Sequence, residues 1–129
     1  MALLSPQILT DEAVQNLVHE ADNEAQVTVH LTYQTPEPGS LIRIWPTTYL
    51  VPQEDSPSSK LITAIGISYA PNWTLLTEAA PFRFTLVFEG LPKSCTLFHL
   101  WEDINQPGGF IIRNIARNQT DIYYLDLEP

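Results

Sequence analysis

The strongest constraint on the fold is a two-residue hydrophobic alternation that recurs in short runs along the chain. In residues 82–89, Phe82, Phe84, Leu86 and Phe88 alternate with mostly polar residues, and only Val87 departs from the pattern. Successive side chains of a strand point to opposite faces, so this run predicts a strand with one buried and one solvated side. Similar runs separated by Pro and Gly signals occupy residues 27–34, 41–45, 48–51, 61–68, 95–102, 110–115 and 122–127.

Seven or eight short strands without alternating helices predict a mainly β fold, specifically an antiparallel two-sheet sandwich, immunoglobulin-like or jelly-roll-like. A chain of 129 residues can bury a core without disulfides or a structural metal, so we expect a single domain over 1–129, with the β-sandwich at 25–129. The alternation predicts a core made of Val29, Leu31, Ile44, Ile65, Phe84, Leu86, Phe88, Leu97 or Phe98, Ile115 and Leu125.

One segment has the period of a helix. Thr10 is a candidate N-cap, and the apolar residues Val14, Leu17, Val18 and Ala21 follow at helical spacing. We therefore expect one N-terminal helix, over about residues 10–22 of a helical segment 1–24. Its apolar stripe is expected to pack against the sandwich.

The C-terminal part of the chain resembles a known type of domain. The strings Phe84-Thr-Leu-Val-Phe-Glu-Gly-Leu-Pro92, Phe98-His-Leu-Trp-Glu102 and Phe110-Ile-Ile-Arg-Asn-Ile115 occur there. Residues 82–127 thereby resemble small bacterial immunoglobulin-like β-sandwich domains of unknown function. The resemblance implies the sandwich fold. It implies no active site, because the matching residues are core and turn residues.

Charge and hydropathy exclude several partners. The chain has 15 acidic and 6 basic residues, a formal net charge of −9, and eight of the acids lie in residues 1–55. Nucleic acid is therefore not expected as a partner, because phosphate binding needs clustered Lys and Arg. No apolar run is long enough to span a membrane and the first residues lack a signal-peptide pattern, so we expect no membrane insertion and a cytoplasmic location.

No catalytic or metal-binding motif is present. His30, His99 and Cys95 lie on different runs or faces, and a lone Cys is most often a small buried hydrophobe. Glu102 and Asp103 are adjacent and are expected to form a solvated strand end rather than an acid–base pair. We therefore expect no catalytic residue, no metal site and no cofactor.

Three groups of residues are candidates for contact with a partner. Trp45 and Trp73 stand at strand ends, and the acids Glu20, Asp22 and Glu24 lie at and beyond the expected helix end. Arg113 and Arg117 lie in the one region suited to an acidic partner, unless they pair with the protein's own acids.

The resulting hypothesis is a non-catalytic protein-interaction domain, or a subunit of a larger bacterial assembly, that binds another protein or a second copy of itself as a homo-oligomer. One alternative is a carbohydrate-binding module that uses Trp and Tyr side chains near the loops. The other is a small enzyme with an unrecognised site.

Overall fold

The computed structural model describes residues 26–34, 36–53 and 56–127, and these form nine strands. The alternating runs become strands because each places one apolar row on the core side. The strands are β1 (Val27–Tyr33), β2 (Ser40–Ile42), β3 (Thr48–Pro52), β4 (Ser59–Ile65), β5 (Thr74–Leu76), β6 (Phe82–Phe88), β7 (Leu97–Glu102), β8 (Ile111–Ala116) and β9 (Ile122–Leu127).

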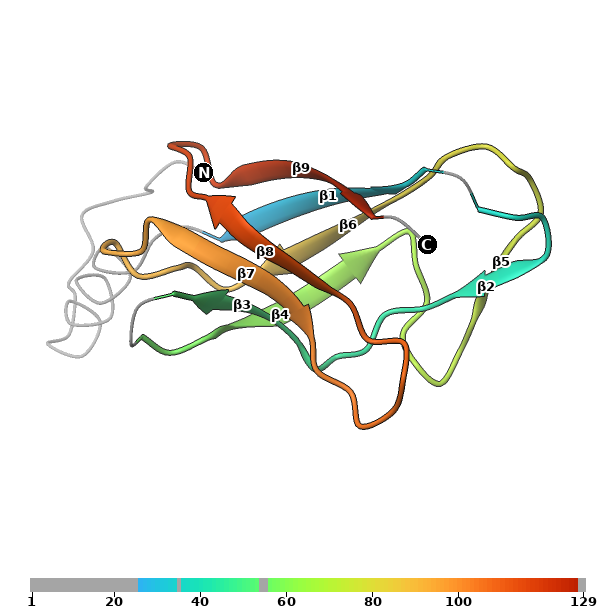
Figure 1. Cartoon of the computed structure of the whole chain (residues 1–129), viewed down its shortest axis with the longest axis horizontal. Coiled ribbons are helices and arrows are strands. Elements are labelled where there is room, and N and C mark those ends of the chain that lie inside the picture. Colours follow the sequence, from blue (N-terminus) through green and yellow to red (C-terminus); the bar gives the residue numbers. More distant parts are fainter. Residues whose placement is uncertain (1–25, 35, 54–55, 128–129) are drawn as a thin grey trace, which may run out of the picture.

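Seven of these strands form one sheet in the order β8-β7-β3-β4-β6-β1-β9, and β2 and β5 form a separate small sheet (Figure 1). The large sheet is mixed, because β1 pairs antiparallel with β6 on one side and parallel with β9 on the other. It also curls over itself. The ring centroids of Phe98 on β7 and Tyr123 on β9 are 5.1 Å apart, although four strands lie between β7 and β9 in the sheet order.

The predicted antiparallel two-sheet sandwich is therefore wrong, although the fold is mainly β. Tyr49 and Leu50 of β3 pair with Lys60 and Ser59 of β4, and this pairing joins the two halves into one sheet. The parallel β1–β9 pair also departs from an antiparallel arrangement. Alternation shows which face of a strand is buried, but it contains no information about the neighbouring strand.

The core fills the inside of the curled sheet. Most predicted core positions are buried, and the largest fully buried side chains are those of Phe88 and Phe98. Leu125 is partly buried and packs against the core, whereas Ile65 has 57% of its surface exposed. The β4–β6 register shifts between Leu61 and Thr63, which leaves Ala64 packed against the core and turns Ile65 outward.

The predicted helix at residues 10–22, and with it Glu20, Asp22 and Glu24, lies outside the described residues. The division into segments 1–24 and 25–129 of a single domain stays a prediction. Within the ranges described above, no helix is long and apolar enough to span a membrane.

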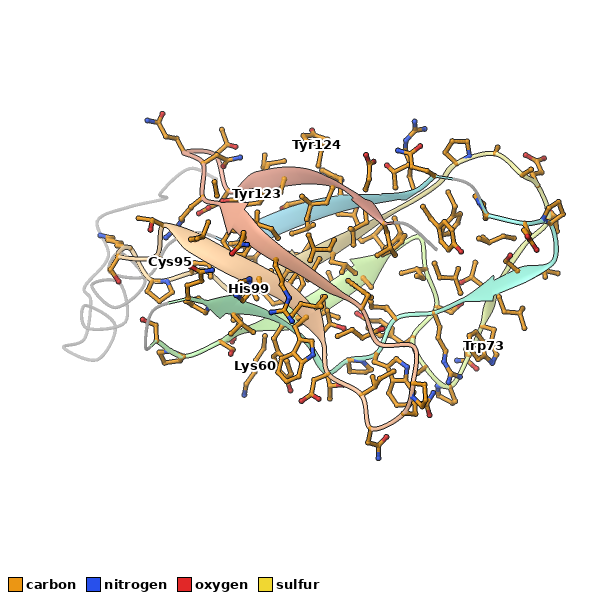
Figure 2. All side chains as sticks on the ribbon, in the orientation of Figure 1. Lys60, Trp73, Cys95, His99, Tyr123 and Tyr124 are labelled. Atoms are coloured by element: carbon orange, nitrogen blue, oxygen red, sulfur yellow. The ribbon has the colours of Figure 1, made fainter. Side chains whose placement is uncertain are left out.

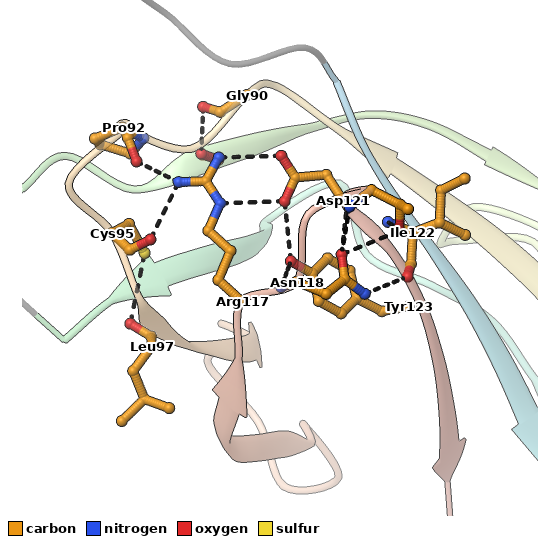
Figure 3. A network of polar contacts seen from close by, with 11 residues as sticks. Gly90, Pro92, Cys95, Leu97, Arg117, Asn118, Asp121, Ile122 and Tyr123 are labelled. Atoms are coloured by element: carbon orange, nitrogen blue, oxygen red, sulfur yellow. Dashed lines mark hydrogen bonds and ion pairs between the residues drawn. The ribbon is translucent and has the colours of Figure 1, made fainter.

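A buried polar network closes the connection between β8 and β9 (Figure 3). The Arg117 guanidinium donates to both carboxylate oxygens of Asp121, from Nε at 3.1 Å and from Nη2 at 3.0 Å. Its Nη1 donates to the carbonyl oxygens of Pro92 and Cys95. The Tyr123 hydroxyl donates to Asp121 Oδ1 at 2.9 Å, and burial raises the pKa of Tyr123 to about 12. Arg117 therefore ties the β6–β7 connection to the β8–β9 turn.

Candidate interaction surface on the arm

The small sheet formed by β2 and β5, here called the arm, extends from the end of the large sheet where β1 stops and β6 begins (Figure 1). Its inner face is fixed to the body. Ile42 packs against the core, Leu76 is buried, and Thr74 Oγ1 accepts a hydrogen bond from the Ser68 backbone N–H at 2.9 Å. One face of the arm therefore packs against the body, and the opposite face is exposed.

Large apolar side chains cover that free face. Leu41 and Leu75 are directly opposite each other in the β2–β5 register, and their exposed fractions are 55% and 57%. Directly opposite residues share a face, and so do residues two apart on one strand. Trp73, half-exposed at 50%, therefore joins Leu75 on this side.

Arg43 connects the two tryptophans that the sequence had indicated separately. Its guanidinium carbon lies 3.8 Å from the ring centroid of Trp73 and 5.1 Å from that of Trp45. Its Nη1 also donates to the Pro71 carbonyl oxygen at 3.2 Å. Cation–π contacts of this kind fix the ring orientation as well as adding attraction. We call this surface, made of Leu41, Arg43, Trp45, Trp73 and Leu75, the arm patch.

A groove of about 190 Å³ separates the arm patch from the loop that follows β7. Gln106, Pro107 and Gly108 form the loop side of this groove, and Glu102 also lines it. The loop lies tightly against the strand end, since a Cβ atom on Gly109 would stand 2.7 Å from the Glu102 carbonyl oxygen. Glycine at that position is required by the close approach.

Glu102 is buried, with only 5% of its surface exposed, so the expectation of a solvated strand end is wrong for this residue. Its Oε2 accepts a hydrogen bond from the Trp45 backbone N–H at 3.2 Å. Burial raises the pKa of Glu102, and the backbone hydrogen bonds and the nearby positive charge of Arg43 oppose that rise. Asp103, the next residue, is exposed as expected.

The raised pKa of Glu102 predicts a pH-dependent effect of Glu102→Gln. Between the ordinary pKa and the raised one, the folded chain keeps a proton that the unfolded chain releases, so stability falls as pH rises through this range. Glutamine removes that loss and can still accept from Trp45. We expect Glu102→Gln to unfold at a higher temperature than wild type at about pH 7 and at nearly the same temperature at about pH 4. Destabilisation at neutral pH would instead show that the charge is net favourable beside Arg43.

The other chemically notable side chains are those of His99 on β7 and Cys95 just before it, both labelled in Figure 2, and that of His30 on β1. His30 Nδ1 contacts Thr85 Oγ1 at 2.8 Å, whereas His99 Nδ1 accepts from the Asn114 backbone N–H at 3.0 Å. Cys95 is buried, as expected for a lone Cys. Within the described part of the chain, no group of three or more His, Cys, Asp or Glu side chains could bind a metal ion.

The two candidate arginines have different surroundings. Arg113 is exposed on β8, whereas the side chain of Arg117 is only 10% exposed and forms an ion pair with Asp121. The sequence left open whether these arginines bind an acidic partner or pair with the protein's own acids. Arg117 pairs with one of the protein's own acids, Asp121. Its guanidinium is directed inward and does not belong to the arm patch.

Sequence reasoning did not single out Leu41, Arg43 and Leu75. Leu41 and Arg43 fell in an expected strand, but β5 was not expected because its three residues are too few to show a period. The available signal was the pair of residues Trp73 and Leu75, whose spacing places both on one face of an extended segment.

No family model, curated protein or solved structure matches the chain. The resemblance of residues 82–127 to bacterial immunoglobulin-like domains therefore stays a prediction, and the arm patch is argued from its geometry alone.

Proposed function

We propose that the chain is a non-catalytic protein-interaction domain and that the arm patch is its partner-binding surface. The observation that supports this most is the row of three large, half-exposed apolar side chains on one face of the arm: Leu41, Trp73 and Leu75. Contiguous exposed apolar surface is costly for an isolated protein and is typical of binding sites.

The composition and rigidity of the arm patch also support the proposal. Trp and Arg are enriched among the residues that contribute most to binding at protein interfaces. Trp73 and Trp45 are already oriented by Arg43, so little side-chain freedom remains to be lost on binding. The two Trp side chains of the arm patch would thus already have their binding orientation before a partner arrives.

The carbohydrate-binding alternative receives less support from the same geometry. A sugar ring stacks on an open aromatic face. The Arg43 guanidinium covers one face of Trp73 at 3.8 Å and also lies over Trp45. Flat, uncovered stacking surfaces are therefore reduced at the two tryptophans that this alternative would use.

A matched pair of variants tests the proposal by affinity capture from the cells that express the protein. Trp73→Ser with Leu75→Ser removes half-exposed side chains from the arm patch. Trp101→Ser with Ile111→Ser removes one Trp and one aliphatic residue, 40% and 41% exposed, from the β7–β8 pair. We expect only the Trp73→Ser and Leu75→Ser variant, here called the arm variant, to reduce recovery of the specific partner by at least about tenfold, since Trp is enriched among the residues that contribute most to binding.

The full-length chain serves as bait, and circular dichroism checks that both variants fold. The proposal would be contradicted if wild type and the arm variant captured equal amounts of the partner. It would also be contradicted if wild type captured no specific partner. If only the Trp101→Ser and Ile111→Ser variant failed to capture the partner, the binding surface would lie on β7 and β8 instead of the arm.

A further inference from the structure

We infer that the partner presents to the arm patch a segment in which apolar side chains are flanked by Lys or Arg. This inference rests on the proposed function and specifies the chemistry of the partner. The charge of the segments that build the arm supports it.

The segments that build the arm and its groove are acidic. Residues 36–45, 71–81 and 102–109 contain four acids, Glu37, Glu78, Glu102 and Asp103, and a single base, Arg43. Glu102 and Arg43 both line the groove and carry opposite formal charges, so they offset each other there. The remaining formal charge of these segments, from Glu37, Glu78 and Asp103, is negative.

The three remaining acids are available to a partner. Glu37, Glu78 and Asp103 are all exposed, and among the described residues the ion pair found is that between Arg117 and Asp121. An apolar surface whose neighbouring segments carry exposed acids complements an apolar segment with basic neighbours. The excess of nine negative charges on the whole chain would also attract such a segment over a longer range.

The same charges argue against a second copy as the occupant. In a symmetric pair, the same surface of each copy meets the other, so the acidic segments that build the arm of each copy would be brought together. Like charges across an interface cost binding energy and act as a specificity device. Mass in solution checks this, because a stable dimer that the Trp73→Ser and Leu75→Ser variant dissociates would overturn the inference.

The test selects binders of the full-length chain from a phage-displayed library of random dodecapeptides. We expect the enriched peptides to combine aromatic or aliphatic residues with Lys or Arg and to lose binding to the Trp73→Ser and Leu75→Ser variant. Enriched peptides that depend on these residues but are neutral or acidic would overturn the inference and leave the proposed function standing. Failure to enrich any peptide that depends on the arm patch would overturn both.

Charge variants measure the electrostatic contribution with one enriched peptide. The triple change Glu37→Gln, Glu78→Gln and Asp103→Asn is expected to weaken binding roughly tenfold at low salt, and less at high salt. Glu89→Gln is the control, since Glu89 follows β6 at the end opposite the arm. Equal affinities of the triple variant and wild type would overturn the inference.

Discussion

Replacing Phe98 by alanine is expected to lower the free energy of unfolding by about 3–5 kcal/mol, the usual loss for a large buried aromatic residue. Phe98 is fully buried on β7, and its ring meets that of Tyr123 on β9 edge-on, with an interplanar angle of 80°. This contact joins two strands that are remote in the sheet order. Alanine would leave a cavity in place of the Phe98 ring. The two halves of the curled sheet would therefore lose their packing contact at this point.

Urea denaturation of wild type and variant measures this loss. Trp101→Ala is the matched control, because Trp101 is on the same strand and is 40% exposed. We expect the control to lose about 1 kcal/mol or less, as substitutions at partly exposed surface sites usually do. Similar losses for Phe98→Ala and Trp101→Ala would contradict the curled sheet with Phe98 at its centre.

Arg117→Met is expected to cost a similar amount, about 3–5 kcal/mol, because it leaves a buried carboxylate without its partner. Asp121 is 7% exposed, and both its carboxylate oxygens accept hydrogen bonds from the Arg117 guanidinium. Methionine can fill the space of the arginine stem. The loss would therefore come mainly from the unpaired charge on Asp121.

A double-mutant cycle separates that charge effect from packing. Asp121→Asn removes the charge, so combining it with Arg117→Met should restore part of the stability lost in the arginine variant. A double variant whose losses simply add would show that Arg117 acts through its contacts with Pro92 and Cys95 instead.

The faces that β1 and β6 bury could be predicted from the sequence. Val27, Val29 and Leu31 of β1 point inward, as do Phe84 and Leu86 of β6, as their alternation indicates. The rule failed at β4, where the register shift between Leu61 and Thr63 exchanged the two faces and exposed Ile65. A bulge depends on how the neighbouring strand pairs, and a single strand's sequence does not contain that information.

The arrangement of the strands could not be predicted for a related reason. Pairing of β1 with β9 brings together residues more than 90 positions apart, and it is parallel. Both parallel and antiparallel neighbours are compatible with the same apolar alternation in a single strand. Many short strands suggested a sandwich, whereas the β3–β4 pairing makes one continuous sheet.

The candidate site was only partly predictable. The positions of Trp45 and Trp73 at strand ends made them candidates for contact with a partner but did not decide whether their side chains lie in the core or on the surface. Nothing in the sequence placed them around one side chain. That meeting requires β5, which is three residues long, to pair with β2. The burial of Glu102 was missed because its neighbour Asp103 and the following loop made the whole strand end look solvated.

Hydrogen–deuterium exchange of the full-length chain, with and without the partner obtained by affinity capture, tests the central claim most directly. The proposed function predicts that binding slows exchange in peptides covering residues 40–45 and 73–76, where the arm patch lies. It predicts little change in peptides from the β7–β8 pair, whose exposed Trp101 and Ile111 offer a competing apolar surface. Slower exchange confined to β7 and β8, with the arm unchanged, would contradict the claim that the arm patch binds the partner.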